Sequence, residues 1–319
     1  MRALVAADGR LDLCERPRPL VPDECLIGVR TAGICGTDLE ILAGYAGFRG
    51  VPGHEFVGVV EWAPEGADDW LGRRVVGEIN IGCGQCRLCR EGVREHCERR
   101  QVLGIRGRDG AFAEYVALPA HNLHLVPDGL PDDVAVFVEP LAAACRVTEQ
   151  LDLSRAPAVV VLGDGRLGLL VAQVLRHAGV RVTVIGRHAE KLAIARRFDL
   201  EAVAADGAEA RRGRFDVVVD ASGRPEGLAS ALALVRPRGT VVLKSTFHGA
   251  APIATSPIVV DEVTIVGSRC GPFAKAIDLL SRGAVEVRPL VSGVYPLSKW
   301  RDAFAVARTN LKVLIDMTS

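Results

Sequence analysis

The segment VVVLGDGRLG, residues 159–168, joins an apolar run to a loop that contains Gly163, Gly165 and Gly168. The run is typical of a buried strand, and the following RLGLLVAQVLRHAG is typical of a helix. In such a turn the first glycine permits the bend, the second lets backbone approach a pyrophosphate, and the third lets helix pack on strand. The segment predicts a dinucleotide-binding loop with a helix N-terminus facing the phosphates. The loop residues expected to bind with these glycines are Asp164, Arg166 and Leu167. The alternative is a glycine-rich turn without a ligand.

Apolar strands and helices alternate on both sides of this loop. The expected strands are APAVVVLG (156–163), RVTVIG (181–186), FDVVVDASG (215–223) and TVVLKS (240–245), separated by helices at 166–179, 188–198 and 227–239. This alternation predicts a doubly wound parallel sheet. Residues 1–119 instead carry short β-rich runs with many glycines and prolines, which predicts a barrel-like β domain. The tail from 271, which ends in LKVLIDM, should rejoin that first domain, so we expect domain boundaries at 1–140, 141–270 and 271–319.

Composition limits the classes of partner. With 319 residues, 49% of them hydrophobic, the chain can bury a large core and form two domains. Its 39 basic and 39 acidic residues cancel, so no overall charge attracts it to nucleic acid or to a membrane. No signal peptide and no long apolar segment stands out in the sequence. We expect a cytoplasmic protein with small-molecule partners that forms a homodimer or homotetramer.

Four of the nine cysteines lie close together in a lobe expected at residues 78–100. They are Cys83, Cys86, Cys89 and Cys97. Clustered thiols in a reducing compartment more often bind metal than form disulfides, and these spacings suit one tetrahedral zinc ion. The alternatives are an iron–sulfur cluster, whose usual cysteine runs differ, and four inert buried thiols. Because four protein ligands leave no position for a substrate, this zinc ion is expected to be structural.

Five motifs in order resemble one family over nearly the whole chain. They are GICGTD (33–38), PGHEFVGVV (52–60), the four cysteines, FVEPLAAA (137–144) and the glycine loop. Together they resemble the zinc-dependent medium-chain alcohol and polyol dehydrogenases, which include sorbitol, threonine and glucose dehydrogenases. The resemblance implies an α/β chain with a GroES-like β-rich catalytic domain and a Rossmann domain. It also implies two zinc ions in each chain, one structural and one catalytic.

The resemblance further assigns roles around the catalytic zinc. It makes Cys35, His54 and Glu139 ligands, and Glu55 either a ligand or the residue that orients them. These are joined by Asp38, which would hold the ligand histidine, and Thr37, which would pass the substrate proton outward. The implied reaction transfers hydride between NAD(P) and a secondary alcohol of a polyol, sugar or hydroxy-amino acid, with the matching carbonyl compound as the other substrate.

Further residues are placed by the same resemblance. Beside the nicotinamide it puts Lys244, Ser245, Thr246 and Arg269. Near the pyrophosphate it puts Lys312. The chain departs from many family members at Glu40, where they have a histidine that completes the proton relay, so the last step of the relay is open.

The end of the second strand bears on the choice of cofactor. An acidic residue about twenty positions after the glycine loop would bind the ribose of NAD, but Gly186 stands there, followed by Arg187 and His188. A guanidinium can bind a 2′-phosphate with several N–H donors. We therefore expect NADP to be preferred and NAD to be the alternative cofactor. If Arg187 is only a surface arginine, this preference disappears.

Two other classes of protein compete with the dehydrogenase interpretation. A regulatory or nucleic-acid-binding protein could keep both the zinc lobe and the Rossmann domain without catalysis. The neutral charge of this chain and its set of candidate zinc ligands, Cys35, His54 and Glu139, argue against that class. A zinc-free reductase of the same fold would have no use for those three residues.

Overall fold

Most of the strands belong to two large sheets, one in each of two units. The structure, a computed structural model, describes residues 1–19, 21–155, 158–208, 211–246, 250 and 253–319. One unit comprises Met1–Glu139 with Val291–Ser319, and the other comprises Pro140–Leu290. No helix in these described ranges is both long and apolar enough to cross a membrane.

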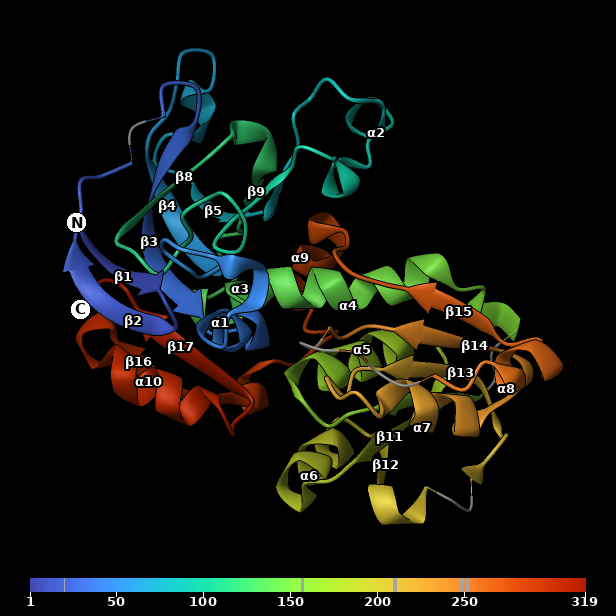
Figure 1. Ribbon diagram of the computed structural model, residues 1–319. Helices are drawn as coiled ribbons and strands as arrows, with labels where there is room; N and C mark the ends of the chain where they lie inside the picture. Colours follow the sequence, from blue (N-terminus) through green and yellow to red (C-terminus); the bar gives the residue numbers. More distant parts are fainter. Residues whose placement is uncertain (20, 156–157, 209–210, 247–249, 251–252) are drawn as a thin grey trace. The chain divides into compact units, whose positions relative to one another are not determined.

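The second unit contains a six-stranded parallel sheet in the order β12-β11-β10-β13-β14-β15. Its strands are β10 (Ala158–Leu162), β11 (Arg181–Gly186), β12 (Glu201–Ala204), β13 (Phe215–Asp220), β14 (Val235–Leu243) and β15 (Thr264–Gly267) (Figure 1). The winding reverses between β10 and β13, and ligands of such sheets bind at the carboxyl ends of the strands at this point. The doubly wound fold is therefore confirmed. The first expected strand began at residue 156, and 156–157 lie outside the described residues.

Helices accompany this sheet. They are α4 (Val138–Gln150), α5 (Arg166–His177), α6 (Ala189–Arg197), α7 (Gly227–Leu234), α8 (Ser256–Val260) and α9 (Phe273–Ser281). The expected helix at 227–239 was too long, because β14 already begins at Val235. Pro237 has no N–H to donate in a helix, and Arg236 bonds Asp216 of the neighbouring strand at 2.7 Å.

The first unit contains a mixed sheet in the order β16-β17-β3-β4-β5-β9, with β8 also paired to β3. Its strands are β3 (Cys25–Gly33), β4 (Glu55–Trp62), β5 (Arg74–Gly77), β8 (Tyr115–Leu118), β9 (Leu123–Leu125), β16 (Val291–Pro296) and β17 (Lys312–Asp316). Two small two-stranded sheets pair β1 (Arg2–Ala7) with β2 (Arg10–Glu15) and β6 (Asn80–Ile81) with β7 (Gln101–Val102). The helices are α1 (Gly36–Leu42), α2 (Arg87–Arg90), α3 (Asp132–Ala135) and α10 (Trp300–Ala307). As expected, the C-terminal strand joins the first sheet, where β17 runs antiparallel to β3.

The chain returns to the first unit at Val291, later than the expected residue 271. Helix α9 stays with the second unit because its apolar face is buried there and Lys275 Nζ donates to Thr148 Oγ1 at 2.7 Å. The following segment is also fixed, since the Gln173 amide exchanges two hydrogen bonds with the backbone of Glu286.

Candidate functional site

The four clustered cysteines come together in one lobe of the first unit. Their sulfur atoms all lie within 4.8 Å of one another. Short elements bring them there, because Cys86 precedes α2 and Cys97 follows a 3-10 turn at Arg94–His96. A side chain at Gly82 would come within 2.8 Å of the Cys89 sulfur, so only glycine fits at this point. All nine cysteines lie in the described part of the chain and are free, so the cluster contains no disulfide.

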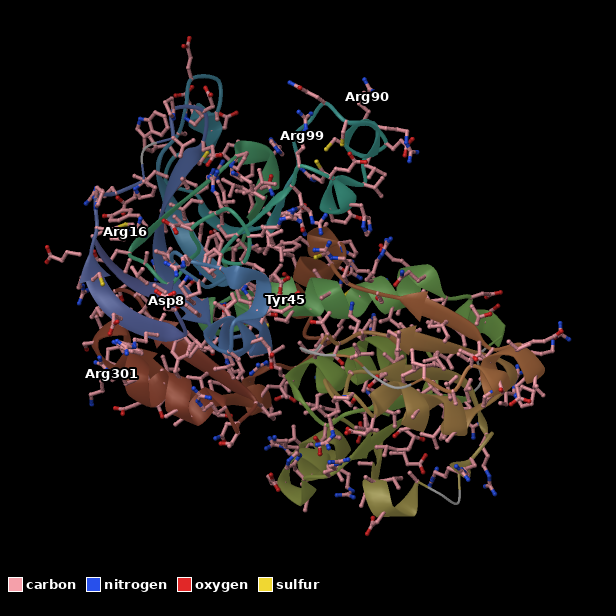
Figure 2. All side chains as sticks on the ribbon, in the orientation of Figure 1. Asp8, Arg16, Tyr45, Arg90, Arg99 and Arg301 are labelled. Atoms are coloured by element: carbon pink, nitrogen blue, oxygen red, sulfur yellow. The ribbon has the colours of Figure 1, made fainter. Side chains whose placement is uncertain are left out.

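The thiols of this lobe differ in their readiness to ionise. Backbone N–H groups of Gln85 and Cys86 lower the pKa of Cys83 to about 6, while burial and the Cys86 thiol raise the pKa of Cys89 to about 11. Arg99, labelled on the lobe in Figure 2, donates to the Cys83 sulfur at 3.3 Å. Four adjacent thiolates repel one another unless a cation lies between them. The donor set and its spacing therefore fit a zinc ion with four sulfur ligands.

A second cluster forms where β3 ends and β4 begins. The ligand atoms of Cys35, His54 and Glu55 lie within 4.8 Å of one another, and His54 and Glu55 are buried. The antiparallel register of the two strands pairs Gly33 with Glu55, which brings the Cys35 loop beside the His54 loop. The family resemblance predicted the members of this cluster, and strand pairing brings them together.

Buried Asp38 organises the second cluster. Its carboxylate accepts the Cys35 N–H at 2.7 Å and the Gly53 N–H at 3.2 Å, and it lies 3.4 Å from Nδ1 of His54. Burial alone would lower the pKa of His54, but the charges of Asp38 and then Cys35 outweigh burial and hold it well above its ordinary value. The same field that stabilises a proton on His54 stabilises a metal cation bound beside it. Thr37 lies at the edge of the cluster, with Oγ1 3.8 Å from the Cys35 sulfur.

Lys312 is buried in the first unit and pairs with Glu55. Its side chain is 1% exposed, and its amine forms an ion pair with Oε2 of Glu55 and donates to the Ile34 carbonyl at 3.3 Å. Contact of Lys312 with a pyrophosphate stays a prediction. Oε1 of Glu55 is buried and has no hydrogen-bond partner among the described residues, as suits an oxygen that binds a metal ion.

Glu139 lies in the first turn of α4, at the end of the first unit. It is outside the group of described residues whose ligand atoms approach within 4.8 Å. Its role as a third or fourth zinc ligand stays a prediction.

The glycine loop of the second unit has the geometry that each position requires. Gly163 has φ +115°, and a side chain there would overlap the Ala221 carbonyl. A side chain at Gly168 would overlap the carbonyl of Gly163, so helix and strand need this glycine in order to pack. Gly165, at the start of α5, has open space around it, as a position approached by a ligand should. The loop edges a pocket of about 510 Å³ at the carboxyl ends of β10, β11 and β13.

Asp164 changes the interpretation of the end of β11. Its carboxylate accepts the N–H groups of Arg187 and His188, both at 2.7 Å, and lies 3.0 Å from the His188 ring nitrogen. Burial would raise the pKa of Asp164, but the backbone and ring hydrogen bonds of His188 and then Arg187 hold it below its usual value. A Cβ at Gly186 would lie 2.6 Å from Asp164 Cγ. The expectation that this end lacks a carboxylate was therefore wrong, since the glycine loop supplies one.

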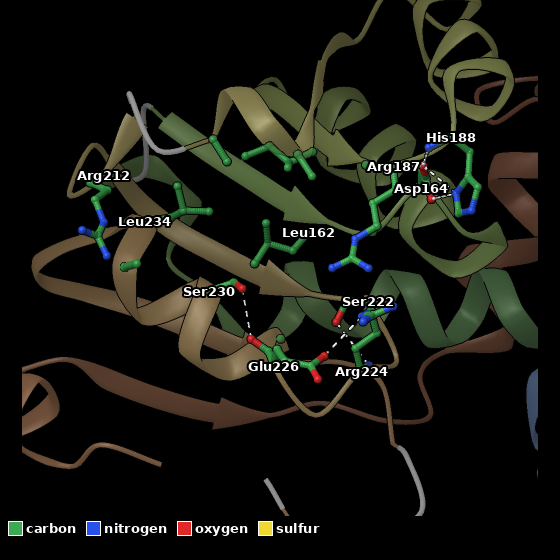
Figure 3. A pocket seen from close by; sticks show the side chains of 17 residues that line it. Leu162, Asp164, Arg187, His188, Arg212, Ser222, Arg224, Glu226, Ser230 and Leu234 are labelled. Carbon is green, nitrogen blue, oxygen red and sulfur yellow. Dashed lines mark hydrogen bonds and ion pairs between the residues drawn. The ribbon is translucent and has the colours of Figure 1, made fainter. Parts of the chain in front are cut away.

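The pocket also contains two cations that the sequence did not indicate, Arg212 and Arg224. Figure 3 shows Arg187 pointing into it, with Arg212 and Arg224 at other parts of the wall. Arg224 bonds Glu226 at 3.3 Å. Neither Arg212 nor Arg224 belongs to a recognisable motif, although Arg224 follows directly on the end of the expected strand at 215–223.

The residues assigned to the nicotinamide follow β14 and β15. Lys244 is buried and donates to Ser268 at 3.2 Å and to the Arg269 carbonyl at 2.5 Å, which ties the two strand ends together. Ser245 accepts the Gly223 N–H at 2.9 Å. Thr246 is exposed. Contact of any of these with a nicotinamide stays a prediction.

Comparison with known proteins agrees with this geometry. Residues 21–128 match the alcohol dehydrogenase GroES-like domain, and residues 167–282 match the zinc-binding dehydrogenase domain. The L-threonine 3-dehydrogenase of Streptomyces avermitilis is 36% identical over 345 residues, and the match covers all of both chains.

Two solved structures resemble the chain throughout. The short chain alcohol dehydrogenase RspB of Escherichia coli CFT073, complexed with NADH, is 29% identical with a TM-score of 0.92, and the match covers 99% of each chain. A zinc-binding dehydrogenase of Sinorhizobium meliloti 1021, bound to NADP, is 30% identical with a TM-score of 0.89, covering 99% of this chain and 98% of the other.

Proposed function

Because the chain belongs to the zinc-dependent medium-chain dehydrogenases, enzymes that transfer hydride between an alcohol and NAD(P), we propose that it oxidises a secondary alcohol of a polyol, sugar or hydroxy-amino acid. The observation that carries the proposal is the buried Cys35, His54 and Glu55 cluster beside Asp38. A thiolate, an imidazole and a carboxylate form the kind of mixed set that leaves a zinc position open for a substrate.

The bound metal and the residues beside the cluster have defined tasks in this proposal. Zinc bound there supplies a Lewis acid that lowers the pKa of the substrate hydroxyl. Asp38 faces Nδ1 of His54 and so leaves the other ring nitrogen for the metal. Thr37 offers a hydroxyl close to the Cys35 sulfur that can accept the substrate proton and pass it outward.

We assign a second, structural zinc ion to the cysteine lobe. Its four sulfurs complete a tetrahedral set, so this ion would stabilise the lobe without taking part in hydride transfer. The total is then two zinc ions in each chain. The free thiols also suit a reducing compartment, which supports a cytoplasmic location.

NADP is the cofactor that we expect to be preferred. Three guanidinium groups, those of Arg187, Arg212 and Arg224, line the pocket at the carboxyl ends of the parallel strands. Guanidinium groups bind a phosphate with charge-assisted hydrogen bonds, each of about 1.5–3 kcal/mol when well formed. We therefore propose that the adenosine end of the cofactor, with its 2′-phosphate, binds in that pocket.

The second unit also carries a surface suited to self-association. Strand β15 is the last strand of its sheet, and the nearby side chains of Val259 and Val260 are 75% and 78% exposed. An open strand edge beside exposed apolar residues favours pairing with a second copy. We propose a homodimer, or a tetramer built from such dimers.

The test is a substrate panel with both cofactors. Purified zinc-loaded protein is mixed with polyols, sugars and hydroxy-amino acids, and reduced nicotinamide is followed by absorbance. Turnover that chelation abolishes and zinc restores would support the proposal. Binding of NADP without turnover of any secondary alcohol would instead favour a regulatory protein.

A further inference from the structure

The carboxylate of Asp164 fills the space that the missing side chain of Gly186 leaves. A Cβ added at Gly186 would meet the Cβ of Asp164 at 2.5 Å and its Cγ at 2.6 Å. Asp164 comes from the glycine loop after β10, and Gly186 ends the neighbouring strand β11. Two adjacent parallel strands therefore place a carboxylate where a side chain of β11 would otherwise begin.

This carboxylate is bound by donors that also suit a phosphate. It accepts the N–H groups of Arg187 and His188, which directly precede the nine-residue helix α6, and it contacts the His188 ring. N–H groups at the start of a helix bind anions well, because they have no partner within the helix and lie at the positive end of its dipole. Asp164 is only 6% exposed, and these bonds keep it ionised.

Arg187 contacts both the Asp164 carboxylate and the pocket. Its N–H bonds Asp164, while its guanidinium points into the pocket (Figure 3). A 2′-phosphate that approached the Arg187 guanidinium would come close to the Asp164 carboxylate on the same turn. The two anions repel each other, and they seek the same backbone donors.

We infer that Asp164 is a specificity-determining residue that occupies, as an internal anion, donors that a 2′-phosphate would use. It lowers affinity for NADP and leaves affinity for NAD almost unchanged. The preference given by the three arginines is thereby reduced, which makes the enzyme less selective between the cofactors. This inference rests on the proposed function, because it assumes that the pocket holds the adenosine end.

A purely structural role for Asp164 predicts the opposite result. If the carboxylate served to hold Arg187 in place for the phosphate, its loss would weaken binding of the phosphorylated ligand. The two roles therefore predict opposite changes in the relative affinity for ligands with and without the 2′-phosphate when Asp164 is replaced.

The experiment compares two fragments that reach only the adenosine end, 2′,5′-ADP and 5′-AMP. Their dissociation constants are measured by titration calorimetry on the full chain and on Asp164→Ser, which frees the donors. We expect the ratio of the 5′-AMP constant to the 2′,5′-ADP constant to rise about tenfold, the effect of one released charge-assisted hydrogen bond. An unchanged or lower ratio would overturn the inference.

Two further variants make the measurement decisive. Asp164→Asn keeps the size of the side chain and removes its charge, so it gives the answer if the serine variant does not fold. Asp216→Asn is the matched control, since it removes a carboxylate that bonds Arg236 and the Ala158 N–H at the other end of the sheet, and it should leave the ratio unchanged. Failure of both fragments to bind the parent protein would reject the proposed cofactor site instead.

Discussion

Replacement of Lys312 by methionine should leave a buried carboxylate without its cation. The side chains of Lys312 and Glu55 are each 1% exposed, and they pair with each other. Methionine preserves most of the volume and the apolar stem while it removes the charge. Breaking a buried pair by removing one partner typically costs about 3–5 kcal/mol, because the other charge remains without compensation. We expect the first unit of the metal-free protein to lose about that much free energy of unfolding.

Tryptophan fluorescence can isolate the unit concerned. The chain has 3 tryptophans, and Trp62, Trp70 and Trp300 all lie in the unit that contains Lys312. This matters because two units need not unfold together, so a whole-protein signal would mix two transitions. With a urea m value of about 2 kcal/mol/M, the expected loss moves the fluorescence midpoint downward by about 1.5–2.5 M.

Three comparisons define the cause of this shift. Lys312→Arg keeps a cation and should recover most of the loss, and Glu55→Gln combined with Lys312→Met should be more stable than Lys312→Met alone. Zinc should reduce the cost, because a metal ion at Oε1 of Glu55 would partly neutralise the carboxylate. A loss below about 1 kcal/mol, or a double variant no better than the single one, would refute the reasoning.

Other residues give simpler tests. Cys86→Ser should lower the zinc content from about two ions to about one and destabilise the lobe, whereas Cys35→Ser should lose the other ion and stay folded but inactive. Elemental analysis measures the zinc content, and urea unfolding measures the stability of each variant. Equal destabilisation of both variants would contradict separate roles for the two ions. Thr37→Ala should reduce kcat about 10²–10⁴-fold with an unchanged dissociation constant for NADP, and a normal kcat with a rate-limiting chemical step would exclude the proton relay. Val260→Asp should shift the protein to a smaller assembly in light scattering; an unchanged mass would exclude this surface.

Features carried by contiguous residues could be predicted from the sequence. The glycine loop is the clearest case, because the roles expected for Gly163, Gly165 and Gly168 match the space around each of them. The cysteine lobe is similar, since short spacings alone bring its sulfurs together. In both, the chain has no freedom to place the residues far apart.

Pairs that depend on strand register could not be predicted. Lys312 and Glu55 are separated by 257 positions, and they meet because β17 and β4 both pair with β3. The sequence indicated that the last strand joins the first sheet, but it did not indicate the register. A shift of one residue would turn Lys312 to the other face of the sheet, so its partner could be known only from the structure.

Gly186 and Asp164 show that the space beside a glycine can be filled by a side chain from another part of the chain. Taken alone, Gly186 indicates an empty strand end, yet the parallel register pairs Leu162 with Ile185 and so places residue 164 beside residue 187. A substitution at either position therefore affects the side chain that can occupy the other. An acid introduced as Gly186→Asp would collide with Asp164 and distort the turn that carries both residues, so that variant alone should bind both 5′-AMP and 2′,5′-ADP more weakly. Combined with Asp164→Gly, the same substitution has room for its side chain, and 5′-AMP binding should return while 2′,5′-ADP binding stays weak. If the single variant binds 5′-AMP as well as the parent, the two side chains do not compete for this space.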